Sequence, residues 1–276
     1  MATGSVLVFG HPEFAKVIQA EFPRLFEVLT RVTAALNDLT GRACEEPEPV
    51  QRVILNLGML AGVSMLELVT LAGNGLGQGA MKIARTLMET VINAEYLRQF
   101  PAELDAYLAW SWVEKKRDLN YVHDNLPHLL PEITQEAIET IEKEYAAAHT
   151  LFANAKGEYR SSWCSLNLAD RATKVGLAEM YRMVNPLSSA FIHGTIGGLA
   201  RHFDTSKDED RISVPPSLEY CSHALVAGHQ SICFVVETLA RTFDWEPVHS
   251  IASLVADFQY AWPVPKPNDG AVSPAQ

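Results

Sequence analysis

Residues 53–72 form an apolar block of about twenty residues that carries one charge, Glu67. A block of this length has to be buried, either in a bilayer or in a protein core. At about 100° per residue its polar side chains fall in one stripe: Asn56, Ser64, Glu67 and Thr70. Membrane insertion would place Glu67 in hydrocarbon, and the preceding segment 42–49 is acidic instead of basic. The block therefore predicts the central helix of a soluble bundle and no membrane span.

The rest of the chain also has helical periodicity, and strand-like alternation is essentially absent. The pattern predicts helices at 12–41, 50–72, 79–99, 102–124, 131–154, 164–175, 177–184, 186–203, 216–243 and 246–260. Asn185 with Pro186, and Pro216, suit helix starts, and Pro23 should kink the first helix. We expect an all-α fold, a single irregular multi-helix bundle of eight to ten helices over residues 12–261. Residues 1–11 are predicted to be a flexible lead-in, and the proline-rich residues 262–276 a disordered tail.

Charge and cysteine usage narrow the functional classes. The 22 basic and 33 acidic residues give a net charge of -11, which disfavours broad nucleic-acid binding. The four cysteines form no CxxC pair, so a reducing, cytoplasmic setting is the natural reading, without a zinc ribbon or disulfide framework. The glycine run at 73–79 lacks the pattern of a phosphate-binding loop, and no histidine motif indicates a metal centre. We expect neither metal nor cofactor.

The helices at 50–72 and 79–99 should form an antiparallel hairpin, because only a short glycine-rich segment joins them. Glu67 and Arg85 lie at similar heights above this turn and could face each other. On the second helix Arg85, Glu89 and Tyr96 make a polar line beside the apolar face. A guanidinium held by carboxylates suits an anionic ligand, with Arg85 as the clamp and Glu89 as its orienter. The alternative is an internal salt bridge that fixes the register of two helices.

A second candidate pair lies on the helix expected from Pro186. Ser189 and His193 are four residues apart, so their side chains stack on one side of a helix. His193 falls on the shoulder of an apolar face and should be partly buried, as a proton-switchable donor or as an ordinary core histidine. The pair by itself is weak evidence for nucleophilic catalysis, which also needs an orienting acid and oxyanion donors.

Four segments in this order resemble a known family: Arg-Thr-Leu-Met-Glu at 85–89 with Tyr96, then 112–116, 172–181 and 188–194. The sequence is similar over about residues 55–240 to a bacterial all-helical family catalogued as domain of unknown function 5677. Its R-x-L-x-E and S-x-x-x-H helices map onto Arg85, Glu89, Ser189 and His193. The resemblance implies a helical bundle and strengthens the case for His193, but it implies no reaction.

Arg117 and His123 fit the R-x(four to six)-H pattern of the HEPN superfamily of helical ribonucleases and abortive-infection effectors. The pattern is short, and in an unbroken helix six residues rotate by about 240°, which separates the side chains. The pair could converge if the helix ended near His123.

Three functions remain open. The first is a cytosolic binding or regulatory protein whose pocket of Arg85, Glu89, Tyr96, Ser189 and His193 holds a small anionic ligand. The second is a HEPN-like ribonuclease effector, in toxicity or phage defence, that uses Arg117 and His123. The third is a structural interaction module. Whether the protein is an enzyme stays open, and homodimerisation is plausible because long apolar helices often pair.

Overall fold

The computed structural model describes residues 10, 12–21, 23–42, 46–152, 160, 162–193 and 218–261. Its described part is all-helical, which confirms the predicted all-α fold. The elements are α1 Pro12–Glu21, α2 Leu25–Thr40, α3 Pro49–Gly73, α4 Gly77–Gln99, η1 Pro101–Glu103, α5 Leu104–Asn125, η2 Pro127–Glu132, α6 Gln135–Phe152, α7 Leu168–Lys174, α8 Ala178–Ile192, α10 Cys221–Phe243 and α11 Ile251–Ala261. Apart from Gly10, the predicted lead-in and tail lie outside the described residues.

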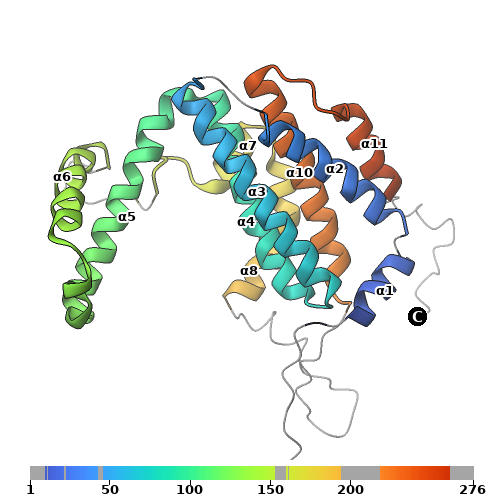
Figure 1. The fold of residues 1–276 in the computed structure, drawn as a ribbon, viewed down its shortest axis with the longest axis horizontal. Coiled ribbons are helices and arrows are strands. Elements are labelled where there is room, and N and C mark those ends of the chain that lie inside the picture. Colours follow the sequence, from blue (N-terminus) through green and yellow to red (C-terminus); the bar gives the residue numbers. More distant parts are fainter. Residues whose placement is uncertain are drawn as a thin grey trace, which may run out of the picture.

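The centre of the bundle consists of α3, α4 and α10 (Figure 1). The predicted hairpin of α3 and α4 is present, and Gly75 in its turn has a φ of 72°, which suits a residue without a side chain. A Cβ atom on Gly58 would lie 2.9 Å from Leu239 Cδ1, so this glycine lets α10 approach α3 closely. Around this centre, α2 and α11 pack on α10, whereas α7 and α8 pack on α4.

The central position predicted for residues 53–72 is correct for one face of α3. That face is buried and includes Ile54, Ala61 and Leu68, but the other face exposes Val63 and Leu66. By length and hydropathy α3 also qualifies as a candidate membrane span, with 39% of its most apolar window buried. Such a helix is weak evidence for a membrane, because core helices of soluble proteins meet the same criteria.

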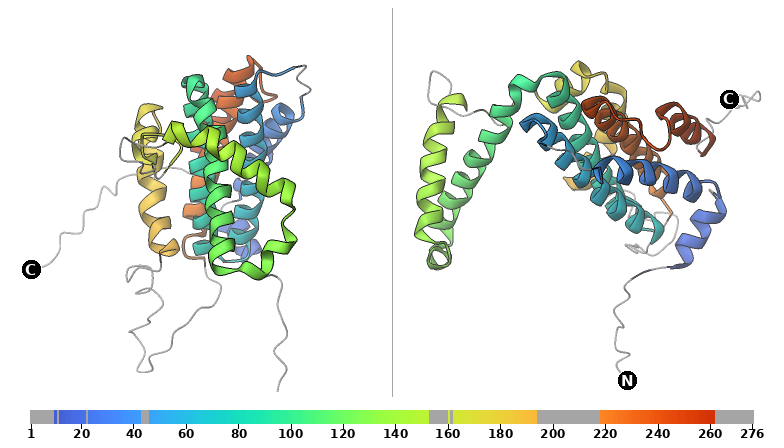
Figure 2. Two further views of the ribbon diagram at one scale, coloured as in Figure 1. Left: turned by 90° about the vertical axis from the view of Figure 1, so that its left-hand side faces the viewer. Right: turned by 45° about the horizontal axis from the view of Figure 1, so that its top comes forward.

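The helices α5 and α6 form an arm that projects from the bundle (Figures 1 and 2). α5 starts at the bundle, and α6 folds back along α5. An edge-to-face contact of Trp110 with Phe152, at 5.1 Å between ring centroids, holds the base of the arm. Farther out, Lys116 pairs with Glu142 across the two helices.

Several predicted helix boundaries are wrong. The break expected at 185 is absent, because α8 runs through Pro186 with Met180, Val184, Ser188 and Phe191 buried along one continuous face. Packing of that face offsets the loss of one backbone hydrogen bond, because a proline has no N–H to donate. Residues 218–220 form a turn, so α10 starts at Cys221, later than predicted. At Pro23, where a kink within one helix was predicted, the helix is instead interrupted: α1 ends at Glu21 and α2 begins at Leu25. The predicted start at Pro216 lies outside the described residues.

Candidate functional site

Arg85 joins two helices that are far apart in the sequence. Its Nε donates to Glu89 Oε1 on the next turn of α4 at 2.9 Å, and its Nη1 donates to Ser189 Oγ on α8 at 2.7 Å. The Arg85 side chain is 23% exposed and that of Glu89 39% exposed. Three of the predicted site residues are therefore in direct contact and can be reached from solvent.

The same line of α4 continues one turn further to a second arginine. Arg171 reaches Asn93 from α7, and its Nη1 donates to Asn93 Oδ1 at 2.7 Å. Because Arg85, Glu89 and Asn93 are spaced by four residues, they lie on one side of α4 over about 12 Å. We call these two neighbouring groups, Arg85 with Glu89 and Ser189, and Arg171 with Asn93, the polar seam.

Arg171 is the unusual member of the polar seam. It is 6% exposed, and its Nε has no hydrogen-bond partner among the described residues. Its guanidinium carbon lies 4.8 Å from the centre of the Trp163 ring, a cation–π contact. Among the described residues no carboxylate forms an ion pair with it. Burial lowers the pKa of Arg171, and the nearby Cys164, Tyr96 and Glu89 oppose that shift, but an arginine stays protonated in proteins.

The charge of the polar seam is unbalanced. Two guanidinium groups face one carboxylate, that of Glu89, which is bonded to Arg85. One positive charge is left over, and it lies on the more deeply buried arginine. An arrangement of this kind can accept one negative charge from outside.

Tyr96 lies beside the polar seam without joining it. The side chain is 3% exposed and packs against Phe100 and Trp163, with ring centroids 4.8 and 5.8 Å away. The Cys164 thiol donates to Tyr96 Oη at 3.6 Å. Burial and the neighbouring Cys164 raise the pKa of Tyr96. Tyr96 therefore supports the aromatic packing behind Arg171 and does not face solvent.

His193 is placed differently from the expectation. It is exposed, and it follows the last residue of α8, where its backbone N–H donates to Ser189 O at 3.0 Å. Partial burial was predicted from an apolar face that contained Ile192, but Ile192 is 44% exposed. The face that packs contains Ser188 and Phe191, and His193 points about 140° away from Ser188. No described contact joins the imidazole to Arg85 or Glu89.

Glu67 and the pair on α5 also lie apart from the polar seam. Glu67 is exposed, and Arg85 binds Glu89 and Ser189 in its place. Arg117 lies over the Trp110 ring at 5.0 Å, whereas His123 is exposed and contacts Asp124 at 2.9 Å. Because α5 continues unbroken to Asn125, Arg117 and His123 face different sides of the helix.

Arg171 and Asn93 were missed by the sequence analysis. A signal for Arg171 was present, since Leu168, Arg171, Ala172 and Val175 have the spacing of one helix face, and three of the four are apolar. An arginine within such a stripe indicates a buried charge. Within the described residues, no group of three or more His, Cys, Asp or Glu side chains is arranged to hold a metal ion.

Comparison with known proteins gives a family without an assigned activity. A profile described as a family of unknown function (DUF5677) matches residues 52–211, more than half of the chain and a segment that contains the whole polar seam. Searches of curated proteins and of solved structures gave no significant match. From this match and the helical fold, the chain belongs to the family of unknown function DUF5677.

Proposed function

We propose that this protein is a cytosolic binding or regulatory protein that holds a small anion, carrying one carboxylate or phosphate group, in the polar seam. The observation that carries the proposal is the buried, unbalanced charge of Arg171 with its unpartnered Nε. A buried polar atom without a partner costs about 1–3 kcal/mol, and an unpaired buried charge costs more. A ligand anion would remove both costs.

Each residue of the seam has a role in this proposal. Arg171, held by its hydrogen bond to Asn93 Oδ1, supplies the uncompensated charge, and its planar donors suit an oxyanion. Arg85 is the second clamp, at the solvent-exposed end. Glu89 and Ser189 fix the Arg85 guanidinium through the two hydrogen bonds described above. Tyr96 backs the site through aromatic packing, and His193 is excluded from the contact set because it is exposed and makes no described contact with the seam.

The experiment is a thermal-shift titration of the full chain with sodium acetate and with sodium phosphate, at constant ionic strength in sodium chloride. A specific anion raises the apparent stability by mass action. We expect one of the two probes to raise Tm, and Arg171→Gln or Arg85→Gln to weaken its apparent affinity at least tenfold. Arg182→Gln is the matched control, because Arg182 is an exposed cation on α8.

Two outcomes would overturn the proposal. The first is the lack of any shift with either probe in the unaltered protein. The second is an equal response in the three variants, which would indicate non-specific screening of charge. In either case a structural interaction module would be the better description of the protein. The ribonuclease alternative has less support, because α5 separates Arg117 from His123.

A further inference from the structure

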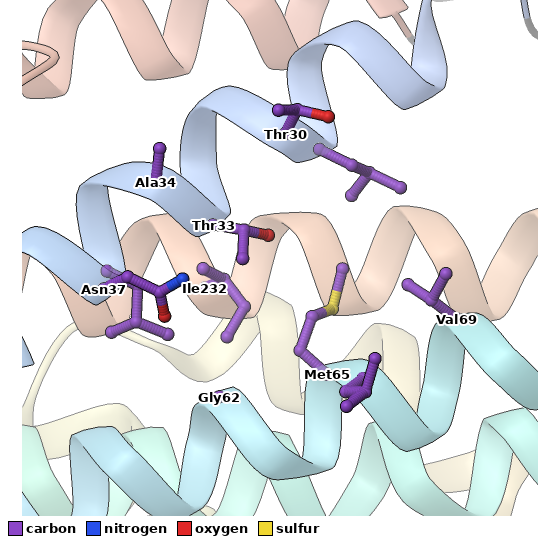
Figure 3. A pocket seen from close by; sticks show the side chains of 11 residues that line it. Thr30, Thr33, Ala34, Asn37, Gly62, Met65, Val69 and Ile232 are labelled. Carbon is purple, nitrogen blue, oxygen red and sulfur yellow. The ribbon is translucent and has the colours of Figure 1, made fainter.

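A groove between α2 and α3 lies on a different side of α3 from the polar seam's helices and has a volume of about 610 Å³ (Figure 3). The two helices lie on α10 and diverge, so Ile232 of α10 contributes to the lining between them. The groove is lined by Leu29, Thr30, Thr33, Ala34, Leu36, Asn37, Gly62, Met65, Leu66, Val69 and Ile232. None of these residues is charged.

One wall of the groove exposes much apolar surface. Leu66 is 69% exposed, more than any other large apolar side chain of the described residues. Gly62, one turn earlier, also lines the groove, and a Cβ atom there would lie 3.4 Å from Leu36 Cδ2. Removing apolar surface from water contributes about 25 cal/mol per Å², so an apolar segment that covered this wall would be held there by the hydrophobic effect.

We propose that the groove is the docking site of this chain's own N-terminal segment, Val6-Leu-Val-Phe9. The segment immediately precedes Gly10, and Gly10 lies against the end of α3: a Cβ atom there would be 3.0 Å from Asn74 Oδ1. The nearest lining residue of the groove on α3 is Val69, which lies five residues, or about 7.5 Å along the helix, from Asn74. The groove extends to Gly62, about 18 Å from Asn74. Val6 lies four residues before Gly10, so the extended segment reaches up to about 14 Å, which is as far as Met65, nine residues before Asn74 on α3.

The chemistry of the two partners matches. Val6-Leu-Val-Phe9 contains no charged side chain, so no ionised side chain loses its hydration on entering an uncharged groove. An extended segment also needs partners for its backbone groups, and Thr33 and Asn37 on the α2 side offer a hydroxyl and an amide. The covalent connection through Gly10 gives the segment a high effective concentration at the groove.

The test is disulfide trapping in the full chain. Ser5→Cys is combined with Ala34→Cys in the groove, in a Cys44→Ser background where the remaining native thiols, Cys164, Cys221 and Cys233, are buried. Ser5→Cys with Thr86→Cys is the control, because Thr86 is exposed on α4 at a comparable height above the α3–α4 turn and outside the groove. With oxidised glutathione, we expect the groove pair to form an intramolecular disulfide at least tenfold faster than the control pair.

A second substitution tests the apolar contact itself. Val6→Asp with Val8→Asp should remove the rate difference between the two cysteine pairs, while circular dichroism shows the fold unchanged. Equal trapping rates in the two pairs without these substitutions would overturn the proposal. Disulfides that form between chains, at a rate that rises with protein concentration, would also overturn it and assign the groove to a second copy.

Discussion

Two buried charges lie along α4, Glu95 on the helix itself and Arg171 packed against it from α7, and their surroundings differ. Glu95 is 7% exposed and accepts hydrogen bonds from Arg98 at 2.7 and 2.9 Å, from Gln99 at 2.7 Å and from Thr238 on α10 at 3.0 Å. Arg171 is buried to the same extent, but within the described part of the chain it has one hydrogen bond, to Asn93, and an Nε without a partner. The first charge is neutralised within the fold, whereas no carboxylate of the described residues forms an ion pair with the second.

A third buried ionisable group, His229 on α10, shows another solution. It is fully buried, and its ring packs edge-to-face on Phe258. Burial lowers the pKa of His229 to about 4, so the imidazole is neutral at pH 7. An arginine cannot give up its charge in this way. Comparison of the three groups therefore singles out Arg171, since a buried arginine needs an anion and the described fold supplies none in ion-pair contact.

The largest change in stability is expected when the paired charge, Glu95, is removed. Glu95→Ala should lower the free energy of unfolding by about 3–5 kcal/mol, because it leaves a partly buried Arg98 without its carboxylate. Urea unfolding followed by circular dichroism measures this change. Arg241→Ala is the control, because Arg241 pairs with Glu237 at the surface and its loss should cost less than about 1 kcal/mol. Equal losses in the two variants would contradict a structural role for the Glu95 network.

The next effect is a dependence of stability on pH. Below pH 6.5 the unfolded chain binds a proton at His229 that the folded chain does not bind, so stability is retained above pH 6.5 and lost as the pH falls towards 4. The full difference corresponds to about 3 kcal/mol. Urea unfolding at pH 7.5 and 5 should show a smaller loss in His229→Leu than in the unaltered protein. An identical loss in both would refute the buried, neutral state of His229.

The Glu95 carboxylate should also make the stability of the fold depend on pH, in a lower range than His229 does. Burial by itself raises the pKa of Glu95, but hydrogen bonds from Arg98, Gln99 and Thr238 outweigh it, and the pKa is lowered overall. Its contribution is present above the ordinary glutamate pKa and is lost as the pH falls through the lower, folded value. In Glu95→Gln, unfolding curves should become less dependent on pH below about 4.5. Unchanged dependence would show that the network does not stabilise the ionised form.

Removal of the unpaired charge of Arg171 should not lower stability as removal of Glu95 does. Arg171→Met keeps an apolar stem of similar length and removes the unbalanced charge, so the free energy of unfolding should stay constant or rise by up to about 2 kcal/mol. Urea unfolding without added anions measures it. A loss of more than about 2 kcal/mol would place Arg171 with Glu95 as a structural charge and would weaken the proposed anion site.

The smallest change in stability is expected for a substitution on the arm of α5 and α6. Because His123 is exposed and contacts only its neighbour Asp124 among the described residues, His123→Ala should change the free energy of unfolding by less than about 0.5 kcal/mol. Expression of the unaltered chain should not slow bacterial growth in a way that this substitution relieves. Relief of toxicity would restore the ribonuclease hypothesis.

Periodicity in the sequence determined most helices, the α3–α4 hairpin and the Arg85–Glu89 pair, because each depends on residues within a few turns of one another. Tertiary structure decided the rest. Ser189 meets Arg85 across 104 positions of sequence, and Arg171 is buried because α7 packs on α4. His193 faces solvent because packing selected the Met180–Phe191 face of α8 and carried the helix through Pro186. Such contacts depend on how separate helices pack, and helical spacing within one segment does not specify that packing.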